Sequence, residues 1–148
     1  MASILSVPSS STPLPSKVTV FSSSSLIADR LCYDIALLSI QSISQTGAFT
    51  LALSGGSVAT QLSNEAFDKA WVTLNVETPQ WDKWHVFLAD ERIVTTTHDD
   101  SNLKLLMDKS FLNVAVGKGC NVYGKFVWRY YNSFFVIYFC FAIEGGWG

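Results

Sequence analysis

Two short polar clusters carry residue types that could do chemistry. The first is Ser54-Gly55-Gly56-Ser57, which separates an apolar run from a helix-forming run that Ser57 would cap. Glycine tolerates positive φ and lets a ligand approach the backbone, and the N–H groups at a helix start suit a phosphate. The cluster predicts a phosphate-binding turn, although two adjacent glycines also occur in ordinary strand-to-helix turns.

The second cluster is Asp90-Glu91-Arg92, which directly follows the apolar run 84–88. In open parallel sheets, ligands bind beyond the carboxyl ends of the strands. Because both clusters follow predicted strands, neighbouring strands would bring them together into one site. The alternative interpretation of residues 90–92 is a solvated turn.

The elements before the first cluster predict a strand, a helix and a second strand. The strands are expected at 18–21 and 49–53, and the helix between them at 26–44, ending at Gly47. The buried stripe of this helix is expected to comprise Ile27, Leu31, Ile35 and Leu38. This order predicts a βαβ unit with parallel pairing.

The alternation continues after the first cluster. A helix is expected at 57–71, a strand at 84–88, a helix at 103–112 and the start of a strand near 123. The inward residues of the two helices are expected to be Val58, Leu62, Ala66 and Ala70, then Leu103, Leu106, Met107 and Phe111. The sequence predicts an α/β fold with a Rossmann-like, mostly parallel sheet, flanking helices and an incomplete C-terminal end.

Composition narrows the class of partners. The chain has 148 residues, is 49% hydrophobic and carries a formal net charge of −2, which supports one packed core and gives no indication of nucleic acid or a membrane surface. The three cysteines are Cys32, Cys120 and Cys140. They form no CxxC pair and no zinc-ligand spacing with histidine, so reduced thiols are expected.

The two ends differ from the middle of the chain. Residues 1–16 are rich in Ser and Pro and lack acidic residues, which predicts a disordered tail or part of a plastid transit peptide. Residues 17–123 have the composition of a soluble domain, whereas 124–148 form an aromatic-rich tail. Its longest apolar run, 134–142, is shorter than the roughly 20 residues that a membrane-spanning helix needs.

Four motifs in this order resemble the 6-phosphogluconolactonase family. They are Leu-Ser-Gly-Gly-Ser at 53–57, Trp-Asp-Lys-Trp-His-Val-Phe at 81–87, Ala-Asp-Glu-Arg at 89–92 and Asp-Ser-Asn at 100–102. The resemblance runs from about Lys17 to Tyr123 and covers the N-terminal half of the family. The wider superfamily includes glucosamine-6-phosphate deaminase, but Arg92 and the pair Trp81 and Trp84 resemble the lactonase.

The resemblance implies hydrolysis of 6-phosphoglucono-δ-lactone to 6-phosphogluconate in the oxidative pentose phosphate pathway, with no metal or organic cofactor. It implies a small sugar phosphate as partner, whose phosphate would contact Ser54, Gly55, Gly56, Ser57 and Asn102. Arg92 would stabilise the oxyanion or bind the phosphate, and Asp90 would orient Arg92 or a substrate hydroxyl. The expected compartment is the cytoplasm, with the plastid as the alternative.

The sequence departs from the family at the general base. The family carries its catalytic His in a downstream Gly-x-Gly-x-Asp-Gly-His segment, which this sequence lacks. His85 is expected to be a packed strand residue and His98 an ordinary loop residue. The alternatives to a lactonase are therefore a non-catalytic phosphosugar-binding fragment and an amino-sugar-phosphate deaminase or isomerase.

The family-like sequence ends at residues 121–123. The next residues, Gly124-Lys125-Phe126-Val127, can be encoded by codons that contain the intron-start pattern GTAAGT. We therefore expect a truncated or intron-retaining product. Its aromatic tail and its missing strands predict low solubility.

Overall fold

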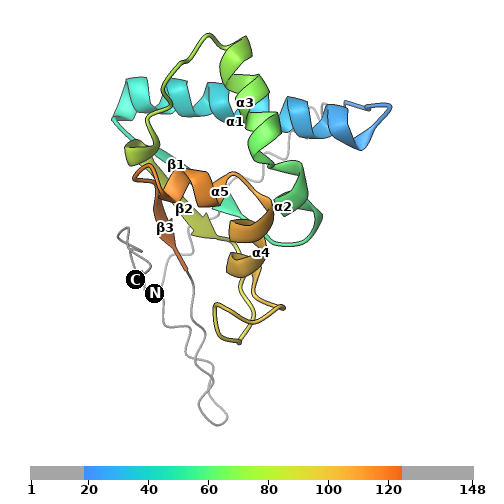
Figure 1. Cartoon of the computed structure of the whole chain (residues 1–148). Helices are drawn as coiled ribbons and strands as arrows, with labels where there is room; N and C mark the ends of the chain where they lie inside the picture. Colours follow the sequence, from blue (N-terminus) through green and yellow to red (C-terminus); the bar gives the residue numbers. More distant parts are fainter. Residues whose placement is uncertain (1–18, 125–148) are drawn as a thin grey trace, which may run out of the picture.

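The described part of the protein is an α/β unit built on a short parallel sheet (Figure 1). The computed structural model describes residues 19–124. Strands β1 (Phe49–Leu53), β2 (Trp84–Leu88) and β3 (Asn121–Tyr123) lie in the order β1-β2-β3, and both pairings are parallel. The predicted fold class is confirmed, and the described sheet is incomplete as expected.

Helices cover one face of this sheet. They are α1 (Ser24–Thr46), α2 (Ser57–Gln61), α3 (Asn64–Thr73), α4 (Asn102–Lys109) and α5 (Leu112–Val116). A 3-10 turn, η1 (Trp81–Lys83), leads into β2. The long helix α1 lies across α3 above the sheet, and α5 lies in front of the sheet (Figure 1).

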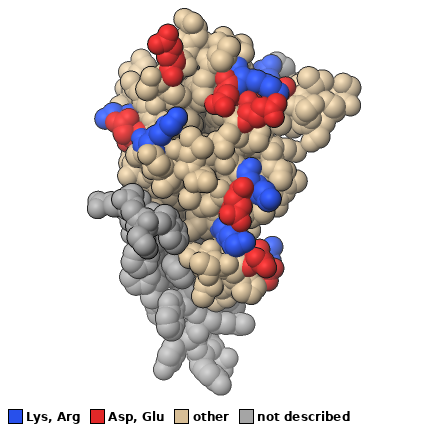
Figure 2. Space-filling view, in the orientation of Figure 1, with Lys and Arg blue, Asp and Glu red and all other residues tan. Residues whose placement is uncertain are grey.

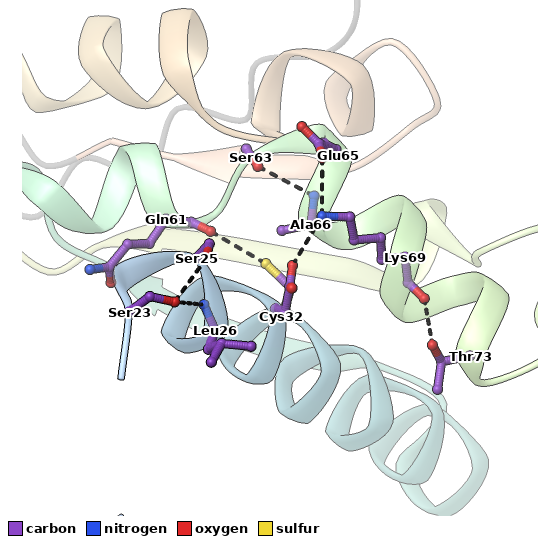
Figure 3. A network of polar contacts seen from close by, with 11 residues as sticks. Ser23, Ser25, Leu26, Cys32, Gln61, Ser63, Glu65, Ala66, Lys69 and Thr73 are labelled. Carbon is purple, nitrogen blue, oxygen red and sulfur yellow. Dashed lines mark hydrogen bonds and ion pairs between the residues drawn. The ribbon is translucent and has the colours of Figure 1, made fainter. Parts of the chain in front are cut away.

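The helix ends follow from local chemistry. Ser63 caps α3, because its Oγ accepts a hydrogen bond from the N–H of Ala66 at 3.3 Å (Figure 3). Ser23 caps α1 in the same way. Gly47 ends α1 in the left-handed conformation, with φ 81°, as its position after the apolar stripe predicted.

The core between helices and sheet is largely aromatic. Trp84 of β2 is fully buried and contacts the rings of Phe49, Phe67 and Phe111. Trp71 and Trp81 complete this cluster with an edge-to-face contact at 5.7 Å. Such pairs add about 0.5–1.5 kcal/mol each beyond the area they bury, so this cluster fixes α3 and the start of β2 on the sheet.

The opposite face of the sheet is open among the described residues. Thr50 and Ala52 of β1 are exposed, while His85, Phe87 and Tyr123 are only partly buried. The rings of Phe87 and Tyr123 stack at 4.5 Å on this face. Parallel sheets are normally covered on both faces, so this face marks where a doubly wound domain would continue.

Two predictions near the start of the domain are wrong. The strand expected at 18–21 does not form over its described residues 19–21, because no strand pairs with them there and Val20 is 88% exposed. The buried stripe of α1 is also rotated. Ile35 is buried, but Leu38 is 54% exposed, and the helix packs through Cys32, Ala36 and Ser39 instead.

The two other long helices predicted are each broken, and one tertiary hydrogen bond explains both breaks. The carbonyl of Leu62 accepts the N–H of Phe111 at 2.8 Å, so it is not used by the next helical turn. The predicted helix 57–71 therefore divides into α2 and α3 at residues 62–63. The predicted helix 103–112 divides at Ser110, before Phe111.

Charges on the surface are interspersed. Figure 2 shows acidic and basic side chains in small mixed groups on the face that it presents. Ion pairs form along helices, such as Lys69 with Glu65 at 3.0 Å and Lys104 with Asp108 at 3.3 Å. Within residues 19–124, no helix is both long enough and apolar enough to cross a membrane. The predicted tail 1–16 lies outside the described residues, as does the predicted tail 124–148 except for Gly124.

Candidate functional site

The two polar clusters meet beyond the carboxyl ends of β1 and β2. Pairing of these strands continues past their ends, because the N–H of Ala89 donates to the carbonyl of Leu53 at 2.7 Å. One residue further on, the hydroxyl of Ser54 donates to Oδ1 of Asp90 at 2.7 Å. The predicted convergence of the two clusters is confirmed at Ser54 and Asp90.

Asn102 joins this pair from the start of α4. Its Nδ2 donates to Oδ2 of Asp90 at 3.0 Å and to the carbonyl of the same residue at 3.2 Å. Each carboxylate oxygen of Asp90 thus has one donor, from Ser54 and from Asn102 respectively. A carboxylate offers about four acceptor positions, so Asp90 retains capacity for a ligand hydroxyl or N–H group.

The glycine turn is shaped by two different constraints. At Gly55, an added Cβ would lie 2.0 Å from Oδ1 of Asn102, so any larger residue would displace that side chain. At Gly56, the backbone has φ 72° and ψ −145°, a conformation that is nearly restricted to glycine. Gly55 therefore admits a neighbouring side chain of the chain itself, a role that the sequence analysis did not anticipate.

The turn leads into a short helix whose cap differs from the prediction. Gly56, not Ser57, is the capping residue of α2, and no side chain caps this helix. Among the described residues, the N–H groups of Gly55 and Gly56 donate no hydrogen bond. The turn thus presents two N–H donors and the hydroxyl of Ser57, because that of Ser54 donates to Asp90, whereas the dipole of a five-residue helix adds little.

Glu91 is the residue whose role was missed. Its Oε1 accepts the N–H groups of Arg92 at 2.8 Å and Asn102 at 2.7 Å. Its Oε2 accepts the N–H of Leu103 at 2.9 Å and the hydroxyl of Ser101 at 3.2 Å. A carboxylate at a helix N-terminus satisfies N–H groups that have no partner within the helix.

One feature of the sequence could have indicated this role of Glu91. Ser101 caps α4 through the N–H of Lys104, yet position 104 is not the Glu or Gln that would complete a capping box. The carboxylate at this helix start is that of Glu91, ten residues before Ser101, and it binds the N–H groups of Asn102 and Leu103. Only the fold places it there, because the intervening loop 92–100 has to turn back on itself.

Arg92 lies beside the cluster without joining it. Its side chain is exposed and makes no hydrogen bond or ion pair with any described residue, while its N–H is held by Glu91. Asp90 forms no hydrogen bond or ion pair with the guanidinium among the described residues. The structure therefore shows no contact through which Asp90 would orient Arg92. An unengaged guanidinium at the edge of the site remains available to an anionic ligand.

The histidines lie away from this cluster. His85 is half-buried on the open face of β2, where its Nδ1 is 2.9 Å from the hydroxyl of Tyr123. His98 is an exposed loop residue whose Nδ1 accepts the N–H of Asp100 at 3.1 Å. Both positions match the predictions, and neither histidine contacts Asp90 or Ser54.

The described cysteines are inert by burial. Burial raises the pKa of both Cys32 and Cys120 to about 12, so the thiols stay protonated at neutral pH. Cys32 Sγ donates to the carbonyl of Gln61 at 3.6 Å, which joins α1 to the end of α2 (Figure 3). Their role is packing.

A cavity of about 470 Å³ lies elsewhere, between α3 and α5. Its walls include Phe67, Trp71, Trp81 and Phe111. It opens beside the start of β2, at the opposite end of the sheet from Ser54 and Asp90. Since ligands of open parallel sheets bind at the carboxyl ends, we assign the site to the polar cluster and not to this cavity.

Comparison with known proteins gives one consistent result. The sequence profile described as glucosamine-6-phosphate isomerases/6-phosphogluconolactonase matches residues 22–125. A probable chloroplastic 6-phosphogluconolactonase 3 from Oryza sativa subsp. indica is 42% identical over 89 residues, which are 60% of this chain and 26% of that protein. A probable 6-phosphogluconolactonase 4 from Arabidopsis thaliana is 35% identical over 108 residues, or 73% of this chain and 39% of that protein.

A solved structure agrees with these relatives. A 6-phosphogluconolactonase from Shewanella baltica matches with a TM-score of 0.55 and 25% identity, over 72% of this chain and 41% of that one. The chain therefore spans about a quarter to two fifths of the length of the proteins that it resembles.

Proposed function

The chain belongs to the family of glucosamine-6-phosphate isomerases and 6-phosphogluconolactonases, and from this premise we propose that its polar cluster binds a sugar phosphate. The reaction we assign to the site is hydrolysis of 6-phosphoglucono-δ-lactone to 6-phosphogluconate. The observation that carries this proposal is the meeting of Ser54, Asp90 and Asn102 at the carboxyl ends of two parallel strands. Both curated relatives described above are named as lactonases, which favours the lactone over an amino sugar.

The glycine turn is the proposed phosphate handle. Gly55 and Gly56 offer backbone N–H groups and Ser57 offers a hydroxyl, whereas the hydroxyl of Ser54 already donates to Asp90. Phosphate oxygens accept several hydrogen bonds at once, and a turn of this kind supplies donors from a small arc of backbone. Asn102 lies against the back of the same turn.

Asp90 and Arg92 are the proposed groups for the reacting end of the sugar. Asp90 would accept a hydrogen bond from a sugar hydroxyl, because each of its oxygens keeps acceptor capacity. Arg92 would stabilise the negative charge that develops on the lactone carbonyl oxygen as water attacks, or would bind the phosphate. Its exposed side chain has no competing partner among residues 19–124.

The general base is the part that this chain does not supply from its described residues. His85 is held by Tyr123 on the open face of the sheet, and His98 lies in an exposed loop. The printed sequence has no Gly-x-Gly-x-Asp-Gly-His segment. The proposal for the described residues is therefore binding of the sugar phosphate, and it assigns none of them as the general base.

Thermal protection by three ligands tests this proposal. The full chain is heated with 6-phosphogluconate, glucosamine 6-phosphate or gluconate, each at the same concentration. A ligand that binds only the folded state raises the melting temperature, so 6-phosphogluconate should raise it most and gluconate, which lacks phosphate, should not. Stronger protection by glucosamine 6-phosphate would move the assignment to the deaminase branch, and no protection would reject a phosphosugar site.

The compartment that we propose is the plastid. The rice relative described above is named as chloroplastic, and residues 1–16 have the acid-free, Ser-rich composition of a transit peptide. The Arabidopsis relative carries no such designation, so the cytoplasm is the competing assignment. A fluorescent fusion to the C-terminus of the chain in leaf cells, with and without residues 1–16, distinguishes the two.

A further inference from the structure

We propose that Asn102 is a positioning residue, which holds the Asp90 carboxylate and the Gly55 turn in place, and is not itself a ligand of the substrate phosphate. This inference rests on the proposed function, because it assigns a role within the same site. It also changes the role that the sequence resemblance gave to Asn102.

The hydrogen bonds of the Asn102 side chain carry the inference. Its Nδ2 donates to both Oδ2 and the carbonyl oxygen of Asp90, at 3.0 and 3.2 Å, so both amide hydrogens are engaged. The remaining Oδ1 is an acceptor, and a phosphate oxygen is an acceptor too. A direct bond from Asn102 to phosphate would therefore require one bond to Asp90 to be broken.

Burial and packing support the same role. Asn102 is 7% exposed, and its Oδ1 fills the space that a Cβ on residue 55 would need. One side chain thus contacts the glycine turn with its oxygen and the second loop with its nitrogen. The glycine turn and the loop that carries Asp90 both contact the Asn102 side chain, which therefore fixes the separation between them.

Glu91 in turn holds Asn102 through the backbone N–H of Asn102. Its N–H donates to Oε1 of Glu91 at 2.7 Å, and the same carboxylate binds the next N–H of α4, from Leu103. The N-terminus of α4 and the site therefore share Asn102.

A double-mutant cycle separates positioning from direct contact. The affinity of the full chain for 6-phosphogluconate is measured by calorimetry for Asn102→Ala, Asp90→Ala and the double variant. If Asn102 acts through Asp90, the affinity falls about tenfold in each single variant and no further in the double variant, because the pair is coupled. If Asn102 binds the phosphate directly, the two losses multiply to roughly a hundredfold, which would overturn the inference.

Ser63→Ala is the matched stability control. It removes a helix cap on α3, remote from the site, so it lowers the melting temperature while leaving affinity unchanged. A loss of affinity in this control equal to that of Asn102→Ala would attribute the effect to general destabilisation and would reject the positioning role.

A second measurement needs no ligand and no change at Asn102. The side-chain amide protons of Asn102 should exchange slowly with water in the wild-type chain and at least tenfold faster in Asp90→Ala, because their acceptors are lost. Equal exchange rates in the two proteins would overturn the inference. Failure of 6-phosphogluconate to bind the wild-type chain would instead reject the proposed function, and the exchange experiment still decides the role of Asn102.

Discussion

At the residue scale, the site is organised by carboxylates that are already partly engaged. Asp90 is held at both oxygens, whereas the Glu91 carboxylate receives four donors and has no capacity left for a ligand. Two adjacent acidic residues thus differ in what they can do. Asp90 is the proposed ligand contact, and Glu91 holds the loop that carries both Asp90 and Arg92.

Replacement of Arg92 tests the proposed cation. Arg92→Ala should weaken 6-phosphogluconate binding by about tenfold to a hundredfold, since a hydrogen bond to a charged group contributes roughly 1.5–3 kcal/mol. The melting temperature should hardly change, because the side chain is exposed and contacts no described residue. Calorimetry measures the first effect, and Arg30→Ala, an exposed arginine on α1, is the control that should bind normally. Unchanged affinity in Arg92→Ala would mean that another residue meets the anion.

Replacement of Gly55 tests the packing behind the turn. Gly55→Ala places a Cβ 2.0 Å from Oδ1 of Asn102, so it should lower the free energy of unfolding by about 1–3 kcal/mol and abolish ligand binding. Gly117→Ala is the matched control, because its nearest neighbour would lie 3.6 Å away and its φ is −61°. Denaturant titration compares the two. Equal stability of both variants would show that Asn102 can move aside at no cost.

The sequence predicted where the site lies, but it did not predict the contacts that individual residues make within it. The order of strands and clusters was sufficient to predict that residues 54–57 meet residues 90–92. It was not sufficient to assign Glu91, because its four donors come from Arg92 and from the start of a helix beyond an irregular loop. Hydrogen bonds between segments that are separated by a loop leave no periodic signal in a sequence.

At the element scale, tertiary contacts divide helices that local periodicity joins. The apolar spacing of residues 57–71 fits one continuous helix, and Leu62, Ala66 and Ala70 are all buried as that spacing predicts. The carbonyl of Leu62 nonetheless bonds Phe111 instead of Ala66. The break lets α2 start at the glycine turn while α3 follows a different direction to pack on α1 (Figure 1).

The helix caps give an element-scale prediction. Ser63→Ala should cost about 1 kcal/mol of unfolding free energy, which is typical for a lost N-cap. Ser101→Ala should cost more, because Ser101 is buried and its hydroxyl bonds Glu91 as well as the N–H of Lys104. Urea titration of both variants measures the difference. A smaller loss for Ser101→Ala than for Ser63→Ala would contradict the role given to the α4 N-terminus.

At the scale of the whole molecule, the described domain is finished on one face and open on the other. Helices and an aromatic cluster bury one side of the sheet, while Thr50 and Ala52 remain exposed on the other. The order of predicted strands and helices gave the α/β fold correctly. Which faces of α1 and of the sheet would be buried could not be predicted, because burial depends on tertiary contacts such as that between α1 and α3, which apolar spacing does not encode.

The open face predicts self-association. Exposed apolar surface and an edge strand with unpaired backbone groups favour contacts between chains, so the wild-type chain should elute as mixed oligomers in sizing with light scattering. Ala52→Lys, on the open face of β1, should raise the monomer fraction. Asn113→Lys, which adds the same charge on α5, should not. A sharp monomeric peak and cooperative melting of the wild-type chain would refute this expectation.

Alkaline pH gives a separate test of the core. Burial raises the pKa of Cys32 and Cys120 from 9.0 to about 12, so the folded state keeps both protons over a range where the unfolded chain loses them. The contribution of these protonated thiols to the free energy of unfolding is therefore complete below about pH 9 and decreases as the pH rises towards 12. Denaturant titrations at several pH values between about 9 and 12 should show this decrease in the free energy of unfolding. If the decrease disappears in a variant with both cysteines replaced by alanine, it arises from these two thiols. An equal decrease in that variant would assign the effect to other groups.

The central claim is that a sugar phosphate binds where the two clusters meet, and hydrogen–deuterium exchange of the full chain with saturating 6-phosphogluconate tests it most directly. At low chain concentration, the ligand should slow exchange of backbone amides in residues 54–58 and 89–93 and leave the peptides around the cavity between α3 and α5 unchanged. Protection around that cavity alone, or no protection at any ligand concentration, would contradict the site described above.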